Sequence, residues 1–180
     1  VGGTLRYITN QPNPGRAEAM FEANVNLVAE DDFGGALRGM VNLPLGDSAA
    51  IRAVGYYTEY GGFVDAIGPA GGDNVNGGRR YGGRLSLRFE PAAGISITPR
   101  VVYQRIRANG FNRQEIYNLY ANPFTNAAVP GGRAPVTFNE REQYLLLRER
   151  FEDETLLADL NVTADLGGVT LTSVSTYINR

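Results

Sequence analysis

The 180-residue chain contains no cysteine and no histidine. The absence of cysteine excludes disulfide scaffolds and thiolate metal sites, and the absence of histidine removes the commonest transition-metal ligand. A Ser–His–Asp triad and a Cys–His pair are excluded for the same reason. Paired carboxylates between residues 140 and 154 could serve glycosidase chemistry or calcium binding, but interleaved arginines favour a mutually neutralised surface. We predict that the protein is not an enzyme and that it holds neither a metal nor a cofactor.

The net charge is small, and long apolar runs are absent. The formal net charge is −2, whereas a nucleic-acid partner calls for a basic surface, so we predict no nucleic-acid binding. No apolar stretch approaches the roughly 20 residues of a transmembrane helix. The mean hydropathy of −0.23 matches an ordinary soluble domain. This average does not argue against a barrel, because lipid-facing and lumen-facing residues alternate along a barrel strand.

Short segments with apolar residues on alternate positions dominate the chain. Leu37 and Val41, for example, lie on odd positions and Arg38 lies on an even one. Residues 51–57 and 84–89 repeat this alternation. A period of two predicts extended strands with one apolar face. Because arginine recurs on the opposite parity, the other face meets water or another polar surface. A membrane β-barrel has this arrangement, with lipid outside and a wet lumen inside.

Tight and long connections alternate between the predicted strands. Tight turns are predicted at residues 44–48, 91–94 and 165–168, and long connections at 61–80 and 108–150. The patterns give about seven strands in all. Short turns at one rim and long loops at the other are typical of outer-membrane barrels. The predicted fold class is therefore all-β, as part of an antiparallel transmembrane β-barrel.

Six segments follow one another in the order found in a known family. They are residues 2–9, which a proline break follows, and residues 38–45, 51–57, 61–65, 81–88 and 171–177. The first resembles the last plug strand of TonB-dependent outer-membrane receptors, and the others resemble barrel strands of that family. The resemblance divides the chain into the last strand of a plug domain at 1–10, a linker at 11–16, and the N-terminal part of the barrel at 17–180.

This resemblance implies a barrel of about 22 strands plugged by an N-terminal domain, in the cell outer membrane of a Gram-negative bacterium. Such a receptor moves a scarce nutrient inward, most commonly a ferric siderophore or a similar iron complex. The implied partners are outer-membrane lipid, the protein's own plug domain, an energy-coupling inner-membrane complex and the small-molecule nutrient. About seven strands are too few to close a plugged barrel, so we expect the chain to be a fragment of a larger protein.

Five arginines fall on the predicted lumen face: Arg38, Arg52, Arg84, Arg88 and Arg100. In one interpretation they line the path of an anionic substrate. In the other they bond plug carboxylates or lumen acids such as Asp159, because a plugged barrel needs polar wall contacts.

The second long loop carries the candidate substrate-binding residues Arg113, Tyr117, Tyr120 and Phe124. Exposed loop aromatics offer a surface for a sugar or a catecholate. The alternative is that they pack a small core of the loop itself.

A soluble β-sandwich that binds carbohydrate or serves adhesion is the alternative to the transporter. It explains the alternation and the long loops equally well. It explains the arginine-bearing faces poorly, because one face of each sheet in a sandwich packs on the other sheet.

Overall fold

The structure is a computed structural model that describes residues 2–3, 8–28, 32–113 and 138–180. The described residues form nine strands and contain no helix. Accordingly, none of them belongs to a helix of the length and apolarity that crossing a membrane requires. The predicted all-β class is confirmed.

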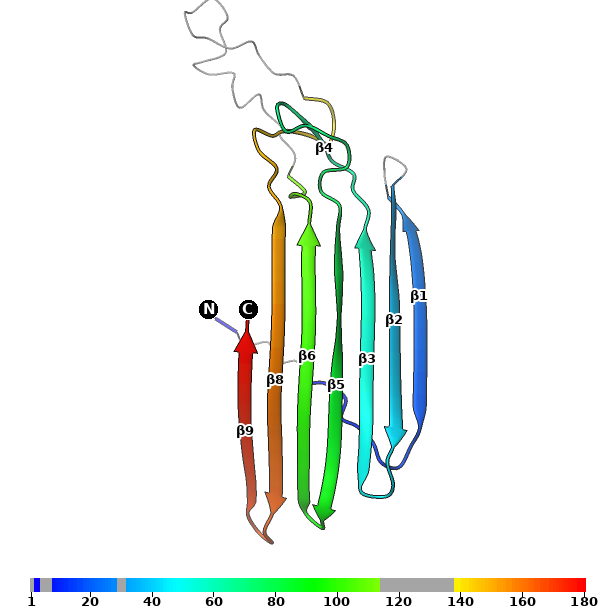
Figure 1. The fold of residues 1–180 in the computed structure, drawn as a ribbon, viewed down its shortest axis with the longest axis vertical. Helices are drawn as coiled ribbons and strands as arrows, with labels where there is room; N and C mark the ends of the chain where they lie inside the picture. The colour runs from blue at the N-terminus through cyan, green and yellow to red at the C-terminus, as the bar shows by residue number, and fades with distance from the viewer. Residues whose placement is uncertain (1, 4–7, 29–31, 114–137) are drawn as a thin grey trace, which may run out of the picture.

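Seven long strands form one antiparallel sheet (Figure 1). In sheet order they are β1 (Glu18–Leu27), β2 (Phe33–Pro44), β3 (Ala49–Tyr60), β5 (Gly78–Ala92), β6 (Ile95–Ala108), β8 (Phe151–Asp165) and β9 (Thr170–Asn179). Each of the five inner strands pairs with the long strands before and after it in the chain, so the sheet is a simple meander. The predicted number of about seven strands is confirmed.

The connections at the two ends of the sheet differ in length. The β2–β3, β5–β6 and β8–β9 turns lie together at one end, and the long β3–β5 and β6–β8 connections extend from the other (Figure 1). Gly46 and Gly94 turn the chain with φ of +101° and +77°, a region that residues with a side chain rarely adopt. The predicted division into a turn end and a loop end is therefore present.

The register places alternate residues of every strand on opposite faces. One row of directly paired residues crosses the whole sheet: Glu18, Asn42, Arg52, Ser86, Arg100, Asp159 and Thr176. The face that carries this row is called the polar face below. The row one residue further along consists of Ala19, Val41, Ala53, Leu85, Val101, Ala158 and Tyr177, and its side is called the apolar face. By this parity, all five predicted lumen arginines share the polar face.

The long connections meet in a small structure of their own, the loop cap (residues 61–77 and 138–148). In it β4 (Asp65–Ile67) pairs in parallel with β7 (Glu142–Tyr144). The buried apolar cluster of the described residues lies here, built from Ala66, Val75 and Leu145, each 6% exposed or less. Among the described residues, the buried apolar cluster therefore lies in the loop cap, and the long sheet contributes Ala50 as its only buried apolar side chain.

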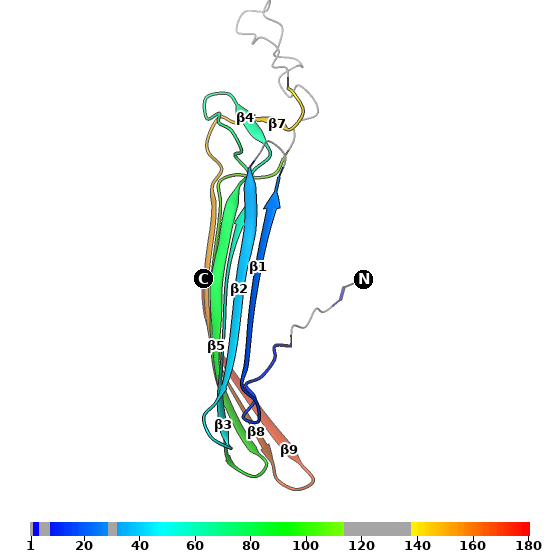
Figure 2. The same ribbon diagram turned by 90° about the vertical axis from the view of Figure 1, so that its right-hand side faces the viewer.

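The described residues before β1 contain no strand. Of the predicted plug strand at 1–10, residues 1 and 4–7 lie outside the described residues, so that assignment stays a prediction. Residues 8–16 lie to one side of the sheet as an irregular segment (Figure 2), called the N-terminal segment below.

Candidate functional site

The N-terminal segment is fastened to the polar face by Asn42. This side chain is fully buried. Its Oδ1 accepts a hydrogen bond from the Asn13 backbone N–H at 2.9 Å, and its Nδ2 donates to the carbonyl oxygens of Asn13 at 2.9 Å and Arg16 at 2.6 Å. One amide therefore satisfies three backbone groups of a segment whose two prolines prevent regular pairing.

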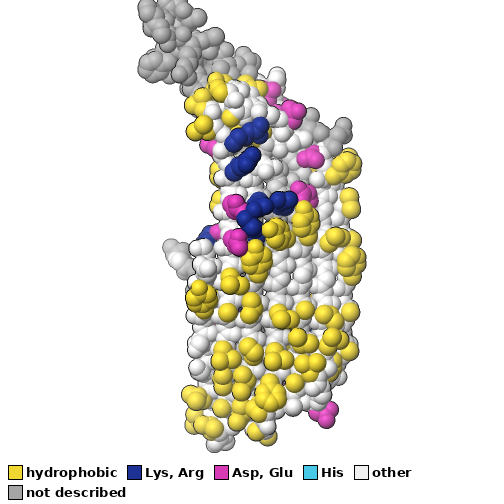
Figure 3. All heavy atoms as spheres, viewed as in Figure 1, with side chains coloured by type: hydrophobic (Ala, Val, Ile, Leu, Met, Phe, Trp, Pro, Cys, Tyr) yellow, Lys and Arg dark blue, Asp and Glu magenta, His cyan; other side chains and the backbone are white. Residues whose placement is uncertain are grey.

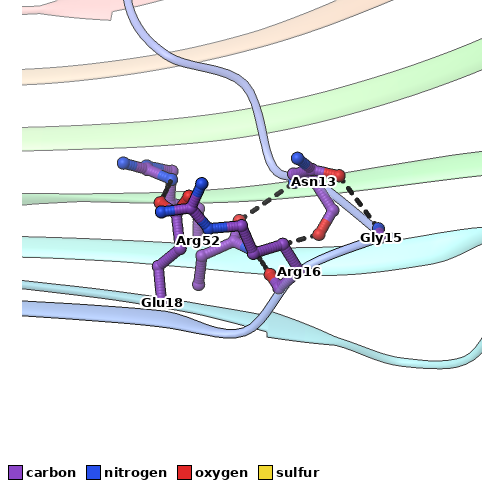
Figure 4. A network of polar contacts seen from close by, with 6 residues as sticks. Asn13, Gly15, Arg16, Glu18 and Arg52 are labelled. Carbon is purple, nitrogen blue, oxygen red and sulfur yellow. Dashed lines mark hydrogen bonds and ion pairs between the residues drawn. The ribbon is translucent and has the colours of Figure 1, made fainter.

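Ion pairs continue this attachment along the same row (Figure 4). Glu18 accepts from Arg52 Nη1 at 3.3 Å and from Arg16 Nε at 2.8 Å. The Arg52 side chain is only 9% exposed, so this guanidinium depends on its carboxylate partner. Arg100 Nε donates to Asp159 Oδ2 at 2.7 Å, and its Nη1 donates to Thr9 Oγ1 at 2.9 Å.

Four of the five predicted lumen arginines pair with acids of their own sheet. Besides Arg52 and Arg100, Arg38 pairs with Glu22 at 3.2 Å and Arg88 pairs with Glu90. This arrangement favours the interpretation in which the arginines make wall contacts. The charges that would attract an anionic substrate are largely neutralised locally.

Arg84 is the exception among the five. It has no hydrogen bond or ion pair within the described residues, and its Nε is buried without a partner. Its direct cross-strand neighbours are Val54 and Val102. The row to which it belongs is otherwise apolar: Met20, Met40, Val54, Val102, Leu157 and Ile178. The polar face thus carries an apolar stripe with one unpaired cation in it.

A cavity of about 670 Å³ opens at the loop end of the polar face and is called the upper pocket. Strand residues Asn24, Asn26, Arg38, Thr58 and Tyr60 line it, together with Phe63, Asn76, Phe111 and Asn112 from the long connections. Amides, hydroxyls and aromatic rings therefore meet in one concave site. Sites of 300–1,000 Å³ with this mixture are typical of small-molecule binding.

The loop cap gives the upper pocket a fixed wall. Asn76 Oδ1 accepts from the backbone N–H groups of Phe63 and Val64, both at 2.8 Å. The Asn109 N–H donates to the Gly77 carbonyl at 2.9 Å, which joins the two long connections at the pocket. Gln143 is fully buried in β7, and its Nε2 donates to the Phe111 carbonyl at 3.2 Å. The pocket's loop residues are thus held by hydrogen bonds to the backbone.

The apolar face is exposed over its whole width. Leu37, Leu85 and Val101 are 50%, 51% and 47% exposed, and no described residue covers them with a second layer. Figure 3 shows apolar side chains over the lower part of this face and charged side chains gathered towards the loop end. A patch this wide greatly exceeds what a soluble monomer leaves uncovered.

Aromatic and charged rows border the apolar face at the loop end. Tyr57 and Tyr81 stack across strands with ring centroids 6.4 Å apart. Further toward the loops, Arg107 Nε donates to Glu152 Oε1 at 2.8 Å, and the cross-strand partner of Arg107 is Arg79. The row of Tyr57 and Tyr81 also contains Arg105 and Glu154, so apolar side chains give way to aromatic and charged ones together towards the loop end.

The structure places the predicted loop residues only in part. Arg113 pairs with Glu149 at 3.5 Å. Tyr117, Tyr120 and Phe124 lie outside the described residues, so their role stays a prediction. The upper pocket was not predicted, although the alternate asparagines Asn24 and Asn26, opposite the apolar parity of their segment, are a signal in the sequence.

Comparisons with protein-family models, with curated proteins and with solved structures found no match. The resemblance to TonB-dependent receptors therefore rests on the sequence segments quoted above and stays a prediction.

Proposed function

We propose that this chain forms part of the wall of a plugged transmembrane β-barrel that takes up a scarce nutrient across the outer membrane of a Gram-negative bacterium. The observation that carries the proposal is the inverted burial of the sheet. One row of the polar face contains the buried side chains of Asn42, Arg52 and Ser86, at 0%, 7% and 3% exposure, while Leu37, Leu85 and Val101 on the apolar face are about half exposed.

Inverted burial argues against the soluble sandwich. Two sheets of a sandwich bury their apolar faces against each other and leave polar faces to water. Here the N-terminal segment packs on the polar face, and the apolar face would have to meet water. Lipid is the environment in which that face is stable, because each exposed apolar side chain then has an apolar neighbour.

The height of the apolar band supports the same proposal. Eight residues separate Phe89 from Tyr81 along β5. At about 3.4 Å per residue they span about 27 Å, or about 21 Å along the membrane normal for a strand tilted by about 40°. Outer-membrane barrels carry an apolar band of about 25 Å bordered by aromatic residues, so the dimensions agree.

The composition of the polar face favours a filled lumen over an open pore. A water-filled channel needs polar walls. The apolar stripe around Arg84 and the bonding of the N-terminal segment instead support contact with further protein. Strands β1 and β9 each have one neighbour in the described sheet, and an edge in lipid needs a partner, so the proposed barrel requires additional strands. The cargo implied by the resemblance is a ferric siderophore or a similar iron complex.

Val101 and Val102 provide a matched test, because they are identical neighbours on opposite faces of β6. The 180 residues contain no cysteine, so with any cysteine elsewhere in the full-length protein replaced, Val101→Cys and Val102→Cys each carry a single nitroxide label. In the full-length protein reconstituted in phospholipid vesicles, we expect lipid-soluble oxygen to relax the label at 101 strongly and the label at 102 weakly. Equally low oxygen accessibility at both positions would contradict the proposal and favour a sheet packed on protein.

A further inference from the structure

We propose that the upper pocket binds an uncharged, hydroxyl-rich ligand of the carbohydrate class. This inference rests on the proposed function, because it assigns the class of cargo that the receptor captures at its loop end. It competes with the anionic iron complex that the family resemblance implies.

The first argument is the supply of unpaired amides. The side chains of Asn24, Asn26 and Asn112 make no hydrogen bond within the described residues, although all three line the pocket. Asn76 uses its Oδ1 on two backbone groups and keeps its Nδ2 available. An amide offers both donors and acceptors, and so does a sugar hydroxyl, so the two groups match in either direction.

Thr58 adds a hydroxyl that the described part of the chain leaves without a partner. Its Oγ1 is buried and has no hydrogen-bond partner among the described residues. A buried hydroxyl without a bond is costly, and a ligand hydroxyl that reaches it removes that cost. Thr58 lies on β3, between Asn24 and Asn26 on β1 and the loop-cap residues that line the pocket. A ligand bound at Thr58 would therefore contact the β1 amides and the loop cap.

The second argument is the pocket's charge. Its charged lining residues are Arg38 and Glu59. Arg38 is paired with Glu22 at 3.2 Å, and Glu59 accepts from the Tyr57 hydroxyl on the apolar side of the sheet. The adjacent Arg80 is not a lining residue; its guanidinium lies over the Tyr56 ring, 5.4 Å from the centroid. A site for an anionic chelate calls for unpaired guanidinium groups facing the ligand, and this lining offers none.

The third argument is the aromatic surface. Phe63, Phe111 and Tyr60 line the same cavity as the amides. Phe111 is 51% exposed and Tyr60 is 46% exposed. Flat apolar rings beside convergent amides suit a ligand with an apolar ring face and a polar edge, which describes a pyranose. The β-strands and the hydrogen-bonded loop cap hold these groups in place before the ligand arrives.

The experiment uses the full-length protein in detergent on an array of defined neutral oligosaccharides, with the best glycan then titrated in solution. We expect binding that changes less than about twofold between 50 and 500 mM NaCl, because no charge pairs form. The double variant Asn24→Ala/Asn26→Ala and the single variant Phe111→Ala should each weaken binding about tenfold or more. The side chains of Asn24 and Asn26 are exposed and make no hydrogen bond within the described residues, and the Phe111 ring is 51% exposed, so we expect the variants to fold. Asn161→Ala, on the polar face near the turn end, is the matched control and should change affinity less than twofold.

Three results overturn the inference. They are no binding to any neutral oligosaccharide on the array, glycan binding that the upper-pocket variants leave unchanged, and salt-sensitive binding of ferric catecholates or hydroxamates in place of glycans. The label pair at Val101 and Val102 tests the proposed function separately. Strong oxygen relaxation at 101 together with a failed array shows that only the cargo class is wrong.

Discussion

Replacing Asn42 by alanine should release the N-terminal segment from the sheet. The fully buried amide bonds three backbone groups, namely the N–H and carbonyl of Asn13 and the carbonyl of Arg16. Alanine removes all three bonds at once and introduces no new group that competes for them. The effect is therefore local to the attachment and does not depend on the pairing of the long strands.

The magnitude follows from the number of bonds. Each hydrogen bond contributes about 0.5–1.5 kcal/mol net, which gives about 1.5–4.5 kcal/mol for three. The Asn13 and Arg16 residues are exposed, so water replaces part of what is lost, and we expect about 2–3 kcal/mol. The population with the segment detached should then rise about 30- to 150-fold. Asn42→Asp should cost at least as much, because a carboxylate would face two carbonyl oxygens.

Trypsin cleavage between Arg16 and Ala17 measures this population. The Arg16 carbonyl at the cleaved bond is the one that Asn42 holds at 2.6 Å, so cleavage requires detachment. Cleavage of a briefly opened segment follows the open population when closing is fast. The control is Asn161→Ala, which loses one long contact of 3.5 Å with Thr163 and should change the rate less than twofold. Equal rates for Asn42→Ala and Asn161→Ala would refute the role given to Asn42.

Three further predictions concern the sheet and the loop cap. Val101→Arg should destabilise the protein in lipid vesicles by about 2–4 kcal/mol and Val102→Arg by much less, measured by urea unfolding; equal costs would contradict the assignment of faces. Gly68 has φ of +101°, and an added Cβ would lie 2.9 Å from the Leu145 carbonyl oxygen. Gly68→Ala should therefore destabilise the loop cap by about 1–3 kcal/mol, seen as faster exchange of the Leu145 amide, whereas Gly55→Ala meets open space and should leave that exchange unchanged. The Asn139 backbone N–H and side-chain amide donate to the Glu142 carboxylate and lower its pKa from the ordinary 4.5. A lowered folded-state pKa stabilises the cap above the unfolded value, and this contribution is lost as pH falls through the folded value. The protection of the Leu145 amide should therefore fall on acidification below about pH 4.5, and Glu142→Gln should remove that dependence.

The sheet could be predicted because its signals are local. An alternation of period two fixes which residues share a face, so the positions of Arg38, Arg52 and Leu85 relative to the sheet follow from the sequence alone. The tight turns were equally visible, since Gly46 and Gly94 occupy conformations that favour glycine. Neither inference requires knowledge of a distant residue.

The loop cap and the upper pocket depend on distant contacts and were not predicted. Strands β4 and β7 have three residues each, too few to show a period. They are also far apart in the sequence, since β4 ends at Ile67 and β7 begins at Glu142. The partners of the arginines also depend on register: Arg100 meets Asp159 only because β6 and β8 align at that pair. For the same reason, no local pattern distinguishes Arg84, which has no polar partner among the described residues, from the four arginines that are paired.

The distribution of charge along the polar face separates two tasks. Arg52, Arg84 and Arg100 lie within two adjacent rows, at the level where the N-terminal segment crosses the sheet. Asn24 and Asn26 lie six to eight residues beyond Glu18 along β1, or about 20–27 Å nearer the loops. In the proposed receptor, a ligand that enters from the loop end reaches the neutral amides of the upper pocket before it reaches the arginine rows. Arg52 and Arg100 already bind acidic side chains or the N-terminal segment. At this level of the polar face, the side chains therefore serve to attach other protein segments to the sheet. The proposal therefore places ligand recognition at the loop end and attachment of the N-terminal segment at the arginine rows of the same face.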